Sequence, residues 1–375
     1  MKEGWEYRLF ESCLVKVPKQ VQVKSKDYKK RGKYPIVSQE AELISGYWDD
    51  ETIVYKHKEP VVIFGDHTKN IKYIDFNFVV GADGTHILST KKDINTKYFY
   101  YVLKSIRLRD LVYARHYKLL KEKSIPVPPL SEQQSIVDYL DSAFAKIDAM
   151  KANTEKALNE AKALFQASLK EMLEPKEGWE EKNLGDCFFS INNGANIKQA
   201  KGAKGIPITR IETLSNDKFN RERLGYADIL DASPYTSYIL NDGDILMSHI
   251  NSMKYLGRAV RYSKKEDETI IHGMNLLRLV PKNNVLSSCL IYQFYTAFFR
   301  NQIATISHQS VNQASFNTTN LKSLKLIIPS LSEQQSIVET LDSLKSKVDR
   351  LQENYNKISQ ECDALKQAIL RQVFE

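Results

Sequence analysis

An eight-residue sequence, LSEQQSIV, occurs twice in this chain of 375 residues, at 130–137 and at 331–338. A second repeat, KEGWE, occurs at 2–6 and at 176–180. The two repeats are offset by 201 and 174 residues, so the second copy is 27 residues longer between its two marks. Repeats this far apart differ from solenoid arrays, whose periods are about 20 to 50 residues. They indicate two similar domains in tandem whose interiors differ.

A long helical pattern follows each copy of LSEQQSIV. Apolar residues recur at spacings of three and four over 131–174 and over 332–375, and neither stretch contains Gly or Pro. This spacing predicts two helices of about 40 residues with an a/d seam of the coiled-coil type. Two such helices in one chain most simply pair with each other in antiparallel fashion. A coiled coil between two chains is the alternative that the pattern leaves open.

Each long helix also has a start signal. Ser131 and Gln134, and likewise Ser332 and Gln335, have the spacing of a capping box, in which each side chain satisfies a free backbone N–H group. Both helices are therefore expected to be capped by these serines.

The remaining stretches, 1–130 and 175–331, hold short runs of β-branched and aromatic residues separated by polar breaks. Such runs predict short strands. We therefore expect an α+β (mixed α/β) fold with two similar globules, 1–130 and 175–331, separated by the two long antiparallel helices, 131–174 and 332–375, in a circular organisation with a pseudo-two-fold axis. The globules hold 24 basic against 16 and 19 basic against 14 acidic side chains, whereas the helices together hold 11 against 16. A polyanion would therefore meet the globules.

Several classes of protein are disfavoured by what the sequence lacks. It contains no run of 18 apolar residues, which predicts that no helix crosses a membrane. The start, MKEGWEYRLF, does not resemble a signal peptide, and four scattered cysteines without a CxxC motif suit a reducing, cytoplasmic setting. The phosphate loop GxxxxGK[ST], HExxH, GxSxG and the [DN]PP[YF] tetrapeptide of adenine methyltransferases are all absent. These absences favour a protein that recognises something over an enzyme, and they predict no metal site.

The segments that lead into the helices resemble one protein family. They are IPVPPLSEQQ at 125–134 and IPSLSEQQ at 328–335, and NDGDIL at 241–246 is similar to a strand entry of that family. Together with two basic globules, they make the chain resemble a specificity (S) subunit of a type I restriction–modification system. The resemblance covers the whole chain. One small departure is Ser330, which stands where the family usually has a second proline.

This resemblance implies a function. Each globule is a target recognition domain that reads one half of a split, asymmetric double-stranded DNA sequence, and the helices set the spacer between the halves. Two methyltransferase (M) subunits dock on the helices, and restriction (R) subunits join through the complex. S-adenosylmethionine, ATP and Mg would belong to those partner subunits, so this chain is expected to be non-catalytic and to hold no cofactor.

Polar segments of the globules are the candidate DNA contacts. Aligned by their repeats, 63–70 falls opposite 246–254, and each reads as an apolar strand that ends in a polar loop. A second polar segment precedes each helix, and the one in the second globule has the hydrogen-bonding side chains that read adenine and guanine edges. Two basic runs suit phosphates. The predicted residues are Lys29, Lys30, Arg31, Lys33, His67, Thr68, Lys69, Asn70, His116, Tyr117, Lys118, Lys198, Lys201, Lys204, Ser248, His249, Asn251, Ser252, Lys254, Gln309, Ser310, Asn312 and Gln313.

Other interpretations stay open at this point. Each polar segment could be an ordinary solvated loop, and each basic run an ordinary solvated surface. The whole chain could be a coiled-coil scaffold that joins two proteins, a fragment of a fused enzyme, or a DNA binder without sequence preference. The sequence gives neither the recognised bases nor the spacer length.

Overall fold

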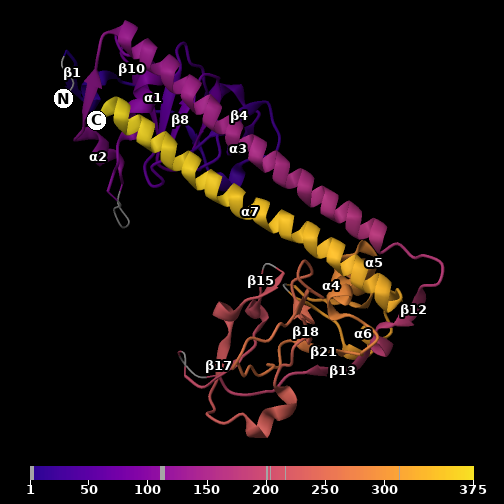
Figure 1. Cartoon of the computed structure of the whole chain (residues 1–375). Helices are drawn as coiled ribbons and strands as arrows, with labels where there is room; N and C mark the ends of the chain where they lie inside the picture. Colours follow the sequence, from indigo (N-terminus) through magenta and orange to yellow (C-terminus); the bar gives the residue numbers. More distant parts are fainter. Residues whose placement is uncertain (1–3, 110–114, 200–201, 203, 216, 312) are drawn as a thin grey trace. The chain divides into compact units, whose positions relative to one another are not determined.

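The computed structural model describes residues 4–109, 115–199, 202, 204–215, 217–311 and 313–375. The chain forms two compact units: unit 1 is Met1–Lys156 with Glu353–Glu375, and unit 2 is Ala157–Gln352. Two long helices, α3 (Leu130–Met172) and α7 (Leu331–Phe374), each contribute to both units (Figure 1). The expected mixed α/β fold with two globules and two long helices is confirmed.

The globule of unit 1 is built on two sheets. A four-stranded antiparallel sheet has the order β2-β10-β7-β8, and a second sheet has the order β3-β9-β4-β5, with β6 also paired to β9. A short ladder joins β1 to β11. The bounds of these strands are β1 Glu6–Leu9, β2 Leu14–Val15, β3 Gln22–Val23, β4 Tyr34–Val37, β5 Gly46–Trp48, β6 Val54–Tyr55, β7 Val61–Gly65, β8 Ile71–Ile74, β9 Phe78–Gly81, β10 Thr85–Thr90 and β11 Ser124–Val127. The helices are η1 Phe10–Cys13, η2 Ser25–Asp27, η3 Glu51–Ile53, α1 Thr96–Ser105 and α2 Tyr117–Lys121.

The globule of unit 2 repeats this frame. Its four-stranded sheet has the order β13-β21-β18-β20, and β12 pairs with β24 as β1 pairs with β11. The bounds are β12 Glu180–Asn183, β13 Phe188–Asn193, β14 Ile206–Ile208, β15 Leu214–Ser215, β16 Lys218–Phe219, β17 Gly225–Ala227, β18 Ile245–Met247, β19 Ile250–Asn251, β20 Ala259–Arg261, β21 Leu277–Pro281, β22 His308–Gln309, β23 Ala314–Ser315 and β24 Lys325–Ile328. The helices are η4 Leu184–Cys187, η5 Ile211–Thr213, η6 Arg221–Arg223, η7 Ser233–Tyr238, α4 Ser287–Tyr295, α5 Ala297–Ile306 and α6 Thr318–Lys322.

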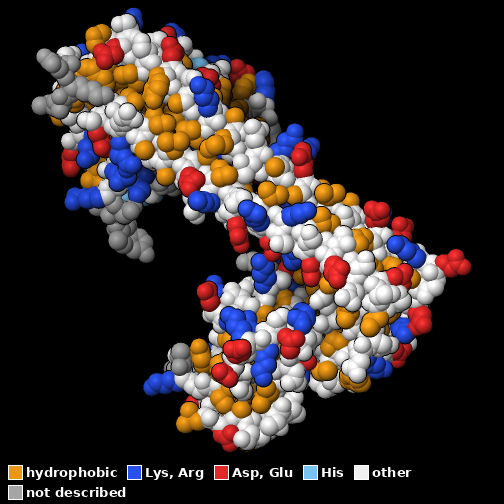
Figure 2. Space-filling model, in the orientation of Figure 1, with side chains coloured by type: hydrophobic (Ala, Val, Ile, Leu, Met, Phe, Trp, Pro, Cys, Tyr) orange, Lys and Arg blue, Asp and Glu red, His pale blue; other side chains and the backbone are white. Residues whose placement is uncertain are grey.

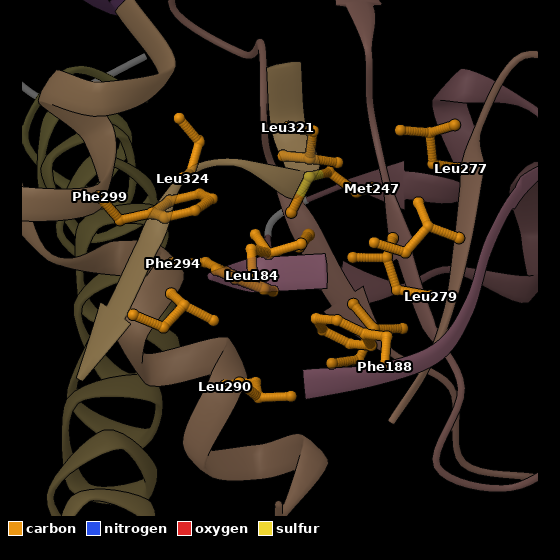
Figure 3. Packing of buried hydrophobic residues seen from close by; sticks show 14 of the residues in the cluster. Leu184, Phe188, Met247, Leu277, Leu279, Leu290, Phe294, Phe299, Leu321 and Leu324 are labelled. Atoms are coloured by element: carbon orange, nitrogen blue, oxygen red, sulfur yellow. The ribbon is translucent and has the colours of Figure 1, made fainter. Parts of the chain in front are cut away.

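The two frames differ in what they carry. In unit 2 the small ladders β14–β17 and β15–β16 come between β13 and β18 in the chain, whereas unit 1 has strands β3 to β6 between β2 and β7. In place of the single helix α1, unit 2 has α4 and α5, which meet at Thr296. The shared frame has its own core: Figure 3 shows side chains from the unit 2 sheet, from η4 and from α4 to α6 packed together, with Leu184, Phe294 and Leu321 among them. Burial of these apolar faces is what holds the helices on the sheet.

The long helices pair in antiparallel fashion within each unit. In unit 1 the Cys362 thiol lies 3.9 Å from the Ile147 carbonyl oxygen, and Lys366 Nζ donates to Asp148 at 2.5 Å. In unit 2 Lys162 Nζ donates to the Gln352 side chain at 2.7 Å. Lys151 Nζ also lies 3.7 Å from the Asp363 carboxylate, so residue numbers rise along one helix as they fall along the other. This confirms an intramolecular helix pair, hereafter the helix pair (α3 and α7).

The LSEQQSIV repeat attaches each helix to its globule through a buried glutamine. The Gln133 side chain accepts from the Asn95 backbone N–H at 2.8 Å and donates to the carbonyls of Asp93 and Pro128 at 3.1 and 2.8 Å. Gln334 makes the same three bonds in unit 2: it accepts from the backbone of residue 286 and donates to the carbonyls of residues 284 and 329. Both glutamines are 0% exposed. A buried amide with all its partners fixes the direction in which each helix leaves its globule.

The capping-box prediction was wrong by two residues. Helix α7 begins at Leu331, so Ser330 is the N-cap: its backbone N–H donates to the Glu333 carboxylate at 3.0 Å, and the Glu333 N–H donates back to its hydroxyl at 3.4 Å. Ser332 and Gln335 lie inside the helix, at its second and fifth positions. Helix α3 has Pro129 at the N-cap position, which has no hydroxyl for such a box.

A tryptophan completes each helix start. The indole N–H of Trp5 donates to the Glu132 carboxylate at 2.9 Å, and that of Trp179 to Glu333 at 3.1 Å. The hydrogen bonds from Ser330 and then from Trp179 hold the pKa of the Glu333 carboxyl below its usual value. The two sequence repeats, KEGWE and LSEQQSIV, are therefore the two sides of one contact, since the tryptophan of one binds the glutamate of the other.

Candidate nucleic-acid interface

In unit 2 the structure brings two predicted polar segments into one small sheet. Strand β19 follows the loop after β18, and strands β22 and β23 form a hairpin between α5 and α6; the three pair in the order β19-β23-β22. Asn251 on β19 lies opposite Ala314, and Gln309 on β22 also lies opposite Ala314. The loop and the hairpin are 60 residues apart in the sequence. Their pairing makes one continuous polar edge of the segments 248–254 and 308–315.

The exposed predicted residues of this edge present hydrogen-bonding side chains to solvent. Gln309, Ser310, Gln313, Ser252 and Lys254 are exposed, and Asn251 is half-buried. The Lys254 ammonium lies 5.4 Å from the centre of the Tyr255 ring, which leaves its charge at the surface. Amide and hydroxyl donors beside a lysine are the groups that contact base edges and phosphates.

Two predicted residues of the same edge face inward. Ser248 is 1% exposed and its hydroxyl bonds to neighbouring backbone and to Asn251. His249 is half-buried, and this burial lowers the pKa of its imidazole, which favours the neutral ring. Their position supports the loop from within. The structure therefore argues against direct DNA contact by Ser248.

In unit 1 the loop after β7 is held by internal bonds. The Thr68 hydroxyl and the Asn70 amide both donate to the Gln39 carbonyl, at 2.5 and 2.9 Å, and the His67 N–H donates to the Gln39 side chain at 3.1 Å. Lys69 takes a φ of +59°, a left-handed conformation that tightens the turn. Thr68 and Asn70 therefore shape the loop, whereas the imidazole of His67 is exposed at its tip.

The second predicted segment of unit 1 lies against this loop. His116 is 4% exposed, and its ring Nδ1 lies 2.9 Å from the Asp66 carbonyl oxygen. The Tyr117 N–H donates to the Asp66 carboxylate at 2.8 Å, and the Tyr117 ring stacks on His86 at 4.0 Å, which together bury much of the tyrosine and raise the pKa of its phenol. The His116 ring is enclosed in this structure, and its contact with DNA stays a prediction. Lys118 is exposed.

A cavity of about 720 Å³ opens beside this cluster in unit 1. Its lining combines the stacked pair with charged side chains of both signs: Lys16, Lys19 and Arg115, and Glu11, Asp66 and Asp83. The Arg115 guanidinium lies 3.9 Å from the buried Asp66 carboxylate. Sequence reasoning missed Lys16 and Lys19 because single lysines in an unremarkable stretch carry no signal until the fold places them around a cavity.

The two predicted basic runs lie one in each unit. In unit 1 all four residues of the run are exposed, and two of them also have acidic partners: Lys29 Nζ lies 2.7 Å from Asp49 and Lys33 Nζ 3.9 Å from Glu51. In unit 2 Lys198 and Lys204 are exposed. Lys201 and Asn312 lie outside the described residues. Exposed cations of this kind suit phosphate contacts.

Among the described residues, no group of three or more His, Cys, Asp or Glu side chains is placed to hold a metal ion. Within the same part of the chain, none of the helices is both long and apolar enough to cross a membrane.

The chain thus has two globules on one frame, each with a polar loop beside a second polar segment and each fixed to a long helix. The model of the family described as "Type I restriction modification DNA specificity domain" matches residues 3–160 and again residues 176–360. The chain therefore belongs to this family of type I DNA specificity proteins.

Individual relatives with similar sequences are named as specificity subunits. A putative type I restriction enzyme specificity subunit, MjaX, of Methanocaldococcus jannaschii is 38% identical over 205 residues, which are 54% of this chain and 47% of that protein. The StySPI specificity subunit of Salmonella potsdam is 28% identical over 276 residues, which are 67% of this chain and 57% of that protein. The matched regions thus span about half the length of these relatives.

Solved structures show the same fold. One chain from a study of complex assembly and conformational transition in the type I R-M system has a TM-score of 0.69 at 17% identity, and the match covers 100% of this chain and 98% of the other. The HsdS subunit of Thermoanaerobacter tengcongensis has a TM-score of 0.52 at 17% identity, with 100% and 97% covered. At these identities the likeness establishes the architecture alone.

Proposed function

We propose that this chain is the DNA-reading subunit of a type I restriction–modification complex, and that unit 1 and unit 2 each read one half of a split, asymmetric double-stranded target. One observation carries the proposal: the same frame places a polar loop, after β7 or β18, beside the segment that precedes α2 or α6 in both units. The residues on that shared frame differ between the units. Two readers with different side chains recognise different half-sites, so the target is not a palindrome.

The helix pair gives the complex its spacing and its docking surface for two M subunits. Unit 1 exposes large apolar side chains along the helices, Tyr139 and Met150 on α3 and Leu365 on α7, at 54, 47 and 46%. Figure 2 shows hydrophobic side chains gathered over the part of unit 1 where Figure 1 draws α1, α3 and α7. An apolar surface of this kind suits a protein partner better than DNA. Restriction (R) subunits join through that complex.

The proposal assigns no catalytic step to this chain. Adenine methylation with S-adenosylmethionine, and ATP- and Mg-dependent cleavage, belong to the M and R partners. The absence of the [DN]PP[YF] tetrapeptide and of a phosphate loop from the full sequence supports this division. The chain's contribution is to choose the sequence and to hold its partners on it.

The test is a map of adenine methylation across the host genome, with the gene intact and with it deleted. We expect a split, asymmetric motif to lose its methylation on deletion and to regain it when the gene is restored. Purified complex with M subunits should bind a duplex of that motif more weakly as salt rises, because phosphate contacts release counterions. A complex that assembles with M subunits but binds no DNA of any sequence would favour the scaffold interpretation.

A further inference from the structure

The tip of the β22–β23 hairpin carries an aliphatic side chain that the chain itself leaves uncovered. Val311 is 98% exposed, the highest value among the exposed large hydrophobic residues. Next to it, the backbone N–H and the hydroxyl of Ser310 both donate to the Gln313 carbonyl, at 2.7 and 3.1 Å, and these bonds close the hairpin. Turns favour Gly, Pro, Asn, Asp and Ser, each for a backbone reason that valine does not share. The turn therefore offers no internal reason for a valine.

The base of the hairpin is firmly held. Ala314 and Phe316 are 1% and 4% exposed and belong to the unit 2 core, together with Phe299 and Ile303 of α5. Pairing of β23 with both β22 and β19 adds backbone bonds on each side. The strands that carry the tip are thus held on the unit 2 core, so a contact made beside them costs less conformational entropy than one made by a free loop.

The surroundings of the tip suit DNA. His308, Gln309, Ser310 and Gln313 are exposed and flank Val311 with hydrogen-bonding side chains. From 269 to 332 the sequence contains five Lys or Arg and not one Asp or Glu, so the segments that carry the hairpin place no carboxylate near an approaching phosphate. A protein partner held by an apolar contact would not require this exclusion of negative charge. Leu230, also in unit 2, is 94% exposed but has no such flanking set.

We propose that the β22–β23 hairpin enters the major groove of one half-site and that Val311 contacts the 5-methyl group of a thymine there. A two-stranded β-ribbon fits the major groove, where thymine alone presents a methyl group and where glutamine pairs with the N6 and N7 edge of adenine. Gln309 and Gln313 then bond adenine edges or backbone beside the contact. The inference rests on the proposed function and deepens it, because it assigns one specificity-determining residue to unit 2 and an A·T pair to its half-site.

The experiment uses the complex of the full chain with its M subunits and a duplex of the mapped motif. Each thymine of both half-sites is replaced in turn by uracil, which lacks only the methyl group, and the dissociation constant is measured for the natural chain and for Val311→Ala. Removal of one buried methyl group corresponds to about a fourfold loss of affinity. We expect one thymine whose replacement weakens binding by about this factor in the natural chain, and by much less in Val311→Ala.

Two further variants complete the test. Leu230→Ala, with an equally exposed aliphatic residue removed from the same unit, should keep the full uracil effect. Val311→Asp should weaken DNA binding at least about tenfold, because it brings a charge against phosphates, while assembly with M subunits, measured by gel filtration, stays intact.

Several outcomes overturn the inference. They are an equal uracil penalty in the natural chain and in Val311→Ala, no responsive thymine in either half-site, or a loss of M-subunit assembly in Val311→Asp, which would make the tip a protein contact. The proposed function fails separately, when the natural complex itself prefers no split sequence.

Discussion

At the scale of single residues, the buried glutamines explain why an eight-residue sequence recurs in two otherwise different halves. Gln133 and Gln334 each reach from the first turn of a long helix into the globule and satisfy one backbone N–H and two carbonyl groups. Their neighbours Gln134 and Gln335 are exposed. Two adjacent glutamines thus have unequal roles, and the exposed one is a matched control for a substitution at the buried one.

We predict that Gln334→Ala lowers the free energy of unfolding by roughly 3 kcal/mol, because it leaves buried backbone groups without partners. Gln335→Ala, one residue further along the same helix, should change the free energy by less than about 0.5 kcal/mol. Denaturant unfolding of the purified chain measures both. Equal losses in the two variants would contradict the assigned role of Gln334.

A second prediction at this scale concerns pH and His272 in unit 2. Burial, with only 1% of the residue exposed, lowers the pKa of this imidazole from its ordinary value of 6.5 to about 4, and its Nε2 lies 2.8 Å from the Leu276 carbonyl oxygen. The unfolded chain binds the proton more readily, so stability is complete above pH 6.5 and is lost as the pH falls toward 4.

The loss over that window is up to roughly 3 kcal/mol. Replacement of the imidazole in His272→Gln should therefore flatten the pH dependence of the free energy of unfolding between pH 7 and pH 4.5. The same substitution at the exposed His308 should leave the slope unchanged. If the free energy of unfolding of His272→Gln still falls with pH over this range, other ionisable groups cause the pH dependence.

At the scale of elements, the helix pair continues from one unit into the other. Lys366 bonds to Asp148 in unit 1, and Lys162 bonds to Gln352 in unit 2. In each pair the two residue numbers add up to 514, so the antiparallel register is the same in the two units. A heptad can therefore be removed from both helices without a change in which faces meet.

We predict that deletion of 153–159 from α3 together with 353–359 from α7 shortens the spacer of the DNA target. Seven residues rise about 10.5 Å in a helix, which matches roughly three base pairs. Methylation mapping of the doubly shortened chain gives the new spacer. Deletion from one helix alone misaligns the seam and should destabilise the chain, and an unchanged spacer in the double deletion would rule out the helices as the ruler.

At the scale of the whole molecule, the proposed reading of one half-site by each unit predicts that the two units act independently. Arg115→Ala in unit 1 is expected to relax or weaken recognition of one half-site and Gln313→Ala in unit 2 that of the other. Because the two residues lie in different units and share no partner, their effects on binding free energy should add within about 0.5 kcal/mol. Binding to duplexes with either half-site altered measures this. A single variant that changes both half-sites equally would contradict the division.

This division was largely predictable from the sequence, whereas the contacts were not. Long periodic patterns placed α3 and α7, because helix period and the absence of Gly and Pro are local signals. The pairing of β19 with β23 joins segments whose contact depends on the whole unit 2 core, and the enclosure of His116 depends on a loop 50 residues earlier. Val311 was missed because an isolated valine in a polar stretch looks like core until its exposure is known.

Unit 1 is built from two separate stretches of the chain, and this affects how the protein folds during its synthesis. Its final stretch supplies part of the core, with Leu370 1% exposed and Phe374 packed edge-on against Tyr98, yet the 196 residues of unit 2 separate this stretch from the rest. At about 5 to 20 residues per second, the ribosome needs roughly 10 to 40 s to synthesise those residues. Until the end of α7 leaves the ribosome, part of the apolar surface of the first globule therefore stays uncovered. A chain truncated within α7 leaves that globule incomplete. Nonsense mutations there should therefore lead to proteolysis of the truncated chain, and no protein that recognises a single half-site should accumulate in the cell.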